Sequence, residues 1–239
     1  MRGRLETRNM GKKGSSMKAA LVGASDFNAG HFACENYGCV VAVDGGYAHL
    51  DAIGVAPDAV VGDFDSLGYV PAAPDVRRFP PEKDESDMEL ACQVAVEAGC
   101  DTLVLYGCLG RRLDHTIANL QVMTRLARTG LRAFAVGDEY AVAVLHGEPG
   151  HPASLAFSPI PAAALAQGAY GACLSAFAIG GAARGVWERG LKYALSDATV
   201  PDDVSLGLSN EFAEAAASVS VEDGDLVVTF PLPAWEYLA

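Results

Sequence analysis

The chain has 239 residues, 51% of them hydrophobic, so it can bury a sizeable core in one large domain or two small ones. Its 17 basic and 30 acidic residues give a net charge of −13, which repels nucleic acid and anionic membranes, and we expect neither as a partner. No apolar run is long enough to span a membrane, and the 6 cysteines form no CxxC pair, which predicts a reduced, cytoplasmic protein.

The first half of the chain alternates strand-like and helix-like segments. Residues 1–16 are basic and lack the apolar core of a signal peptide, so we expect a disordered extension or a misplaced start. Strands are then expected at 18–23, 39–46, 58–65, 101–107 and 131–137, and helices at 28–37, 48–54, 86–99 and 114–129. The alternation predicts a mostly parallel α/β sheet with flanking helices over residues 17–139.

After about residue 140 the pattern changes to short alternating runs between Gly, Pro, Asn and Asp turns. This pattern predicts a small all-β sandwich domain over residues 140–239. Within it, residues 159–168 are expected to form a loop or a single helical turn. Residues 218–230 (SVSVEDGDLVVTF) are expected to form a hairpin around EDGD.

Four acidic motifs lie where the expected strands end or the expected helices begin: DGG (44–46), PDAVVGDFDS (57–66), KDESD (83–87) and GRRLDHTIAN (110–119). In open α/β sheets, ligands bind beyond the carboxyl ends of the strands. Asp63 and Asp65 are two residues apart, so on an extended segment both carboxylates point to the same side. Such a pair suits Mg²⁺, which takes oxygen ligands; the alternative is a turn whose Asp side chains cap the backbone.

The KDESD motif lies at the start of an expected helix. Asp84 and Asp87 are one helical turn apart, where they either supply further acids to the site or cap the helix, with Ser86 or Asp84 as the N-cap. Lys83 is placed to meet a phosphate.

The loop motif GRRLDHTIAN brings cations to the same region. Arg111 and Arg112 offer planar donors for phosphate oxygens, unless they are merely solvated. Asp114 and His115 start the next helix, with Asn119 one turn later on the same face as His115. Acids and a basic loop at strand ends fit phosphoryl transfer, although the chain has no Walker-type loop, dinucleotide fingerprint or GxSxG elbow.

These four motifs, in this order, resemble the thiamine pyrophosphokinase family, whose pattern runs DGG, PD…GD.DS, D.TD and GG.GGR.DH…N. GLKYAL (190–195) and LGLSNEF (206–212) look like the family's thiamine-binding domain, and the resemblance covers roughly residues 18–230. The chain departs from the pattern at Ser86, where Thr is usual, at Arg111, which replaces a Gly, and at Tyr193, where some members have Trp. Residues 148–172 fit the pattern poorly.

The resemblance implies transfer of the pyrophosphoryl group of ATP to thiamine, giving thiamine diphosphate and AMP. It implies Mg²⁺ as cofactor, ATP as co-substrate, and a homodimer that holds thiamine at the subunit interface. Two alternatives stay open: a pyrophosphokinase acting on another alcohol such as a hydroxymethylpterin, and a non-catalytic thiamine or nucleotide sensor. The GLKY and SNEF segments weigh against the first, and the intact set of acids weighs against the second.

The resemblance also implies roles for individual residues. The metal ligands would be Asp63, Asp65 and Asp87, and the catalytic set would add Asp84, Arg112 and Asp114. Either Asp114 or Asp84 would accept the proton of the reacting hydroxyl. The remaining binding residues would be Asp44, Gly45, Lys83, Arg111, His115 and Asn119, with Tyr193, Ser209 and Asn210 facing thiamine.

Overall fold

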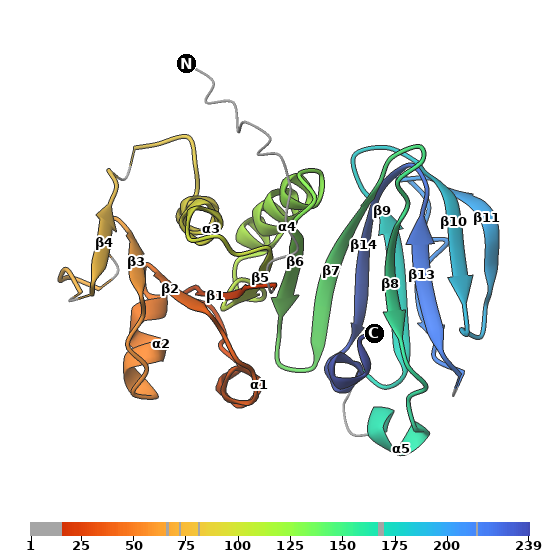
Figure 1. Cartoon of the computed structure of the whole chain (residues 1–239), viewed down its shortest axis with the longest axis horizontal. Helices are drawn as coiled ribbons and strands as arrows, with labels where there is room; N and C mark the ends of the chain where they lie inside the picture. The colour runs from red at the N-terminus through yellow and green to blue at the C-terminus, as the bar shows by residue number, and fades with distance from the viewer. Residues whose placement is uncertain (1–15, 66, 72, 81, 167–169, 214) are drawn as a thin grey trace.

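The structure is a computed structural model that describes residues 16–65, 67–71, 73–80, 82–166, 170–213 and 215–239. The expectation for residues 1–16 therefore lies, apart from Ser16, outside the described residues. Within this part of the chain, the strands form a ten-stranded sheet and a four-stranded sheet (Figure 1). None of the helices described there is long and apolar enough to cross a membrane.

Six parallel strands form one half of the large sheet, in the order β6-β5-β1-β2-β3-β4. Helices α3 and α4 cover one face of this half, and α1 and α2 cover the other (Figure 1), which explains why β1, β2, β3 and β5 are almost continuously buried. The elements are β1 (Lys18–Val22), α1 (Ala29–Cys34), β2 (Cys39–Val43), α2 (Gly46–Ala52), β3 (Ala59–Gly62), β4 (Asp75–Arg78), α3 (Asp87–Glu97), β5 (Thr102–Tyr106), α4 (Leu113–Ala127) and β6 (Arg132–Val136). The expected α/β alternation is confirmed. Strand β4 was not expected, because its sequence DVRR is that of a polar edge strand.

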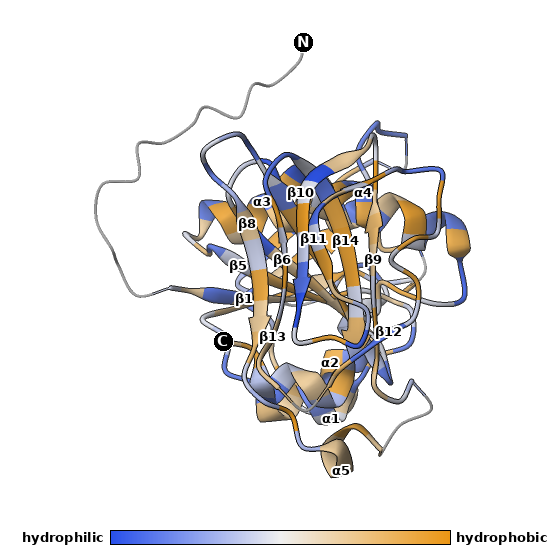
Figure 2. Cartoon of the chain, turned by 90° about the vertical axis from the view of Figure 1, so that its right-hand side faces the viewer, coloured by the Kyte–Doolittle hydropathy of each residue, from blue (hydrophilic) through white to orange (hydrophobic). Residues whose placement is uncertain are grey.

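Antiparallel strands extend the same sheet beyond β6, in the order β7-β14-β9-β12. The four-stranded sheet, β11-β10-β13-β8, packs on β7 and β14. Figure 2 faces this second sheet and shows apolar and polar segments along its strands. The elements are β7 (Tyr140–Gly147), β8 (Ala153–Phe157), α5 (Ala162–Leu165), β9 (Cys173–Ala178), β10 (Ala183–Arg189), β11 (Leu195–Val200), β12 (Asn210–Glu211), β13 (Ala217–Val221), β14 (Gly224–Pro231) and the 3₁₀ helix η1 (Leu232–Tyr237).

The expected hairpin over residues 218–230 is wrong. β13 pairs with β8 and β10, whereas β14 pairs with β7 and β9, so the chain crosses from one sheet to the other at Glu222 and Asp223. β13 alternates between buried and half-buried positions, whereas β14 is buried almost throughout, as a central strand must be. Of the loop and the single helical turn considered for residues 159–168, the structure has the helical turn, which is α5.

One of two hydrophobic clusters lies on one face of the parallel strands and continues into the sandwich, and the other packs α3 and α4 against the opposite face. The Trp235 ring of η1 lies 5.0 Å from the ring of Phe134 on β6, and its Nε1–H donates to Glu35 at 2.9 Å. Phe230 lies 5.2 Å from Phe157 on the facing sheet. The division into residues 17–139 and 140–239 stays a prediction, and both the sheet and the first of these clusters run across it.

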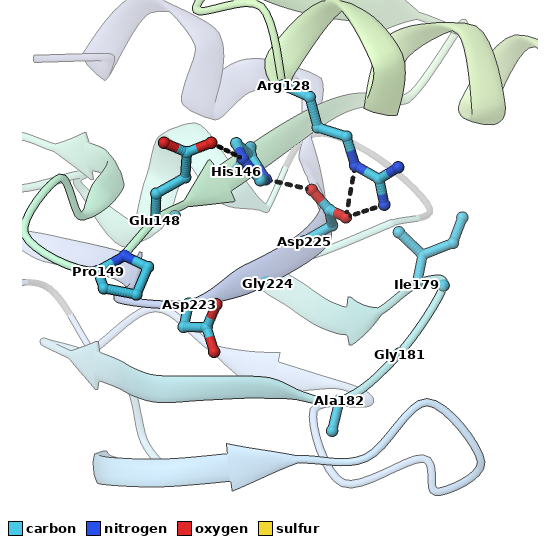
Figure 3. A pocket seen from close by; sticks show the side chains of 12 residues that line it. Arg128, His146, Glu148, Pro149, Ile179, Gly181, Ala182, Asp223, Gly224 and Asp225 are labelled. Atoms are coloured by element: carbon cyan, nitrogen blue, oxygen red, sulfur yellow. Dashed lines mark hydrogen bonds and ion pairs between the residues drawn. The ribbon is translucent and has the colours of Figure 1, made fainter.

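A polar network ties the end of α4 to the antiparallel strands (Figure 3). The Asp225 side chain, 5% exposed, accepts hydrogen bonds from Arg128 Nε at 3.0 Å and Nη2 at 2.5 Å. Its other oxygen lies 2.7 Å from Nδ1 of His146, whose Nε2 lies 3.2 Å from Glu148. Asp225 is therefore the buried centre of a network that joins α4, β7 and β14.

Asp225→Ala should lower the free energy of unfolding by about 2–3 kcal/mol, because Arg128 and His146 both lose a charged hydrogen-bond partner. Urea unfolding followed by circular dichroism measures the loss. The control is Asp223→Ala, which removes a half-exposed side chain whose ion pair with Arg184 is 3.5 Å long and should cost less than about 0.5 kcal/mol. Equal losses in the two variants would contradict the role given to Asp225.

Candidate active site

A cleft of about 600 Å³ opens beyond the carboxyl ends of β1, β2, β3 and β5, where α3 and α4 begin. Residues following four different strands line it: Gly23, Asp44, Asp63 and Gly107. This is the edge of an α/β sheet at which ligands bind, and it is the edge at which the four sequence motifs were expected to meet.

The strand ends that frame the cleft require glycine at two positions, because neighbouring backbones approach too closely there for a side chain. A Cβ atom on Gly46 would lie 1.8 Å from the carbonyl oxygen of Val22. Gly107 has φ +56°, and a Cβ there would lie 2.2 Å from the carbonyl oxygen of Gly23. The second glycine of the DGG motif is therefore a packing requirement of the site's frame.

Four of the predicted acids, Asp44, Asp63, Asp87 and Asp114, line this cleft together. Asp44 adopts a left-handed conformation, with φ +48°, and donates its backbone N–H to Val61 at 2.8 Å. Asp44, directly after β2, thus lines the cleft with a backbone conformation that is unusual for a residue other than glycine.

Asp65 is not placed beside Asp63 as the two-residue spacing implied. Phe64 is buried and has φ +65°, so the segment is a turn and not an extended strand. The backbone N–H of Asp65 donates to Asp63 Oδ1 at 3.0 Å, and the Asp65 side chain is exposed and outside the cleft lining. The premise that both carboxylates point to the same side of an extended segment is therefore wrong.

The start of α3 supplies both a cation and an acid. Lys83 Nζ lies 2.9 Å from Asp87 Oδ1, and both residues line the cleft. Ser86 caps the helix by accepting the N–H of Glu89 at 3.2 Å, which decides between the two N-caps considered. Asp84 is exposed and does not line the cleft.

The loop before α4 brings two guanidinium groups to the opposite wall. Arg112 donates through Nε and Nη2 to the two carboxylate oxygens of Asp114, at 2.9 and 2.6 Å. These hydrogen bonds hold the pKa of Asp114 far below its usual range. Arg111 is exposed, and its Nε lies 3.2 Å from Asp26. Both arginines line the cleft.

Two other predicted residues of α4 also line the cleft. His115 is exposed there. Asn119 is 6% exposed, and its amide donates to the carbonyl of Cys108 at 2.7 Å, so it fixes the end of β5 against the helix. Gly45, the N-cap of α2, is not among the lining residues.

The cleft fits a magnesium ion that is bound together with phosphates. Among the described residues, no three Asp, Glu, His or Cys side chains are placed to hold a metal ion by themselves. Mg²⁺ commonly takes only one or two protein carboxylates and completes its shell with water and substrate phosphate oxygens. The carboxylates of Asp44, Asp63 and Asp87 are hard oxygen donors of the right kind.

The three residues expected to face thiamine lie outside this cleft. Tyr193 is 61% exposed, and Ser209 is exposed with φ +57°. Asn210 is 4% exposed, and its side chain makes hydrogen bonds to both the N–H and the carbonyl of Tyr193, at 2.9 and 2.7 Å. Asn210 thus joins the GLKY and SNEF segments.

Sequence reasoning missed Glu188, which lies beneath these segments. Glu188 is 1% exposed and accepts a hydrogen bond from Asn210 Nδ2 at 2.5 Å, and burial raises its pKa. The available signal was its position two residues after Val186, since alternate residues of a strand face the same side. A glutamate on the same face of a strand as a buried valine indicates a buried carboxyl group.

The fold and the cleft define a protein with a parallel α/β sheet, acids and arginines at the carboxyl edge of that sheet, and an adjoining β-sandwich. The family model "Thiamin pyrophosphokinase, catalytic domain" matches residues 32–135, and "Thiamin pyrophosphokinase, vitamin B1 binding domain" matches residues 164–226. Together the two matches cover more than half of the chain. The chain belongs to the thiamine pyrophosphokinase family, and the resemblance seen in the sequence is confirmed.

Individual relatives agree with this assignment. The curated thiamine pyrophosphokinase of Bacillus subtilis (strain 168) is 32% identical over an alignment that covers 38% of this chain and 46% of that protein, about half of its length. The solved structure of thiamine pyrophosphokinase from Bacillus subtilis has a TM-score of 0.74 at 20% identity, covering 90% of this chain and 98% of that chain. The structure from Geobacillus thermodenitrificans has a TM-score of 0.73 at 25% identity, covering 90% and 97%, and the one from Candida albicans 0.71 at 12%, covering 90% and 89%.

Glu188→Gln should become progressively more stable than the unaltered protein as pH rises. Since burial raises the pKa of Glu188 in the folded state, ionising it there is harder than in the unfolded chain. The unaltered protein therefore loses stability, relative to the variant, from the ordinary glutamate pKa of about 4.3 up to the raised pKa, and the difference is constant outside that window.

Urea unfolding of both proteins across this pH range measures the difference. Glu82→Gln, which alters an exposed glutamate, is the control and should give no such trend. A stability difference between Glu188→Gln and the unaltered protein that is independent of pH would contradict the buried, neutral carboxyl group.

Proposed function

We propose that the protein transfers the pyrophosphoryl group of ATP to thiamine, forming thiamine diphosphate and AMP. The observation that carries this proposal is the composition of the cleft: Asp44, Asp63 and Asp87 line it together with Lys83 and the arginine loop. Such a site suits polyphosphate, and the chain also matches the family's vitamin B1 binding domain.

The cleft would bind the triphosphate of ATP. Lys83, Arg111 and Arg112 would meet phosphate oxygens, assisted by the positive N-terminal ends of α3 and α4. Asp63 and Asp87, with Asp65 from the adjoining turn, would hold Mg²⁺, and Asp44 would support them. When bound, the ion neutralises phosphate charge.

In the proposed reaction, the hydroxyl oxygen of thiamine forms a bond to the β-phosphorus of ATP, the bond from that phosphorus to the α–β bridging oxygen breaks, and AMP leaves with this oxygen. The hydroxyl proton goes to a carboxylate. Asp114 and Asp84 both stay candidates for the acceptor. Asp114 lines the cleft, whereas Asp84 is exposed outside the lining, between Lys83 and Glu85, which belong to it.

Thiamine would be held between two subunits of a homodimer. Tyr193 and Ser209 lie outside the cleft of their own chain, so the partner subunit would supply them. Their surroundings support this proposal: Tyr193, Val204, Leu206 and Leu208 are large apolar side chains that are each more than half exposed. The Tyr193 ring would face the cationic thiazolium. A cytoplasmic location is part of the proposal and is supported by 6 unpaired cysteines.

The purified protein, mixed with Mg-ATP and thiamine, should produce AMP and thiamine diphosphate in equal amounts. Asp63→Asn should reduce AMP formation about 100-fold or more, because the variant loses a carboxylate from the phosphate-binding cleft. Chromatographic product analysis measures both.

The matched control for this variant is Asp51→Asn, an exposed position on α2 that should leave the rate unchanged. Near-normal turnover of folded Asp63→Asn would refute the assignment. ADP as product would indicate ordinary kinase chemistry, and thiamine binding by calorimetry without AMP release would favour the sensor.

Arg111→Ala should raise the KM for ATP several-fold and leave the KM for thiamine unchanged. The guanidinium of Arg111 is exposed at the cleft, so its attraction for phosphate should also weaken at high salt. Steady-state kinetics at low and high ionic strength measure the effect. Arg184→Ala, which removes an exposed arginine of β10, is the control. An unchanged KM for ATP at low salt would show that Asp26 keeps Arg111 away from the phosphates.

A further inference from the structure

The side chain of Asn210 has no hydrogen-bonding capacity left for a ligand. Its Nδ2 donates to Glu188 Oε2 at 2.5 Å and to the Tyr193 carbonyl at 2.7 Å. Its Oδ1 accepts the backbone N–H groups of Tyr193 and Glu211, both at 2.9 Å. A neutral amide offers two donor hydrogens and two acceptor lone pairs, and all four are used. Asn210 therefore acts on a bound molecule only through what it holds.

The segment that Asn210 holds is the exposed Tyr193 segment. Both the N–H and the carbonyl of Tyr193 bind this one amide, and the neighbouring Lys192 donates its N–H to the Glu211 carbonyl at 2.9 Å. The adjacent Ser209 is fixed separately, through its N–H to Ser175 Oγ at 2.9 Å. The position of Tyr193 thus depends directly on how the Asn210 amide is oriented.

We propose that Glu188 is a positioning residue for the substrate-binding segment: its buried carboxyl group orients the Asn210 amide, which in turn fixes Tyr193. The proposal rests on the proposed function, in which Tyr193 contacts thiamine. Glu188 would touch no substrate itself, since it is 1% exposed.

Two features of Glu188 set it apart from an ordinary core residue. No ion pair to its carboxyl group occurs among the described residues, and its Oε1 is buried there without a hydrogen-bond partner. An apolar side chain of similar size would avoid both penalties. Among the described residues, the hydrogen bond to Asn210 is the one polar contact of the Glu188 side chain, so we infer that its contribution is to orient that amide.

The test compares Glu188→Leu with Glu188→Gln in steady-state kinetics with Mg-ATP and thiamine. Glu188→Leu should raise the KM for thiamine about tenfold, because Asn210 loses a buried partner, with little change in kcat or in the KM for ATP. Glu188→Gln keeps an acceptor oxygen and should bring the KM for thiamine to within about threefold of the unaltered value. An unchanged KM for thiamine in Glu188→Leu, or an equal rise in both KM values, would overturn the proposal.

Val219→Ala is the matched control, because Val219 lies directly opposite Glu188 in the β10–β13 register and is fully buried. It should lower stability without raising the KM for thiamine, and a rise equal to that of Glu188→Leu would overturn the proposal. If Glu188→Leu does not fold, Asn210→Asp tests the same link, since a carboxylate there cannot donate to Glu188 or to the Tyr193 carbonyl.

Amide hydrogen exchange separates this proposal from the proposed function, because it needs no substrate. The amides of Tyr193 and Glu211 should exchange faster in Glu188→Leu and keep their protection, relative to the rest of the sandwich, in Val219→Ala. If Glu188→Leu shows this faster exchange but the protein makes no thiamine diphosphate, the link from Glu188 to Tyr193 is supported and the proposed activity is refuted. Unchanged exchange in Glu188→Leu would refute the link.

Discussion

The close approach of backbone at the carboxyl ends of the parallel strands is the constraint on which the site depends. A Cβ on Gly46 would overlap the Val22 carbonyl, and one on Gly107 would overlap the Gly23 carbonyl. Only because these positions carry no side chain can the segments after β1, β2 and β5 approach one another this closely. Acids that follow β2, follow β3 or begin α3 then line the same cleft as the arginines before α4. The chemistry of the side chains therefore depends on the backbone geometry of the strand ends.

The electrostatics of the cleft follow from that convergence. Carboxylates near a polyphosphate are unfavourable unless a cation lies between them, so the acids make sense only with a divalent ion and with fixed positive groups opposite. The structure keeps those positive groups partly engaged in advance: Lys83 is paired with Asp87, and Arg112 with Asp114. Each pair holds its cation near the cleft, and in the proposed function an incoming phosphate would exchange one anionic partner for another. A chain with net charge −13 would in this way bind a substrate that is itself strongly anionic.

The parallel half of the fold could be predicted because its strands are short apolar runs separated by amphipathic helices, and both patterns are local. The crossover between β13 and β14 could not, because EDGD is compatible with a hairpin and with a change of sheet; the choice depends on which neighbours bury Leu226–Val228. The site shows the same limit. The spacing of Asp63 and Asp65 predicted a shared direction, but burial of the Phe64 ring turns the chain between them. The sequence therefore predicted only in part which acids line the cleft.

Asn210 and Glu188 show why a motif does not by itself assign a role to a residue. The letters S, N and E are expected to mark a thiamine-binding segment, yet an asparagine whose four hydrogen bonds are all internal is a structural element of that segment. Counting donors and acceptors requires coordinates, because three of the four partners lie on residues 17 to 22 positions away in sequence. Burying the carboxyl group of Glu188 is unfavourable for stability. Because this group contacts a single amide, the orientation of the Asn210 amide depends on Glu188. We therefore infer that the position of the exposed Tyr193 segment is set by Glu188, which is buried.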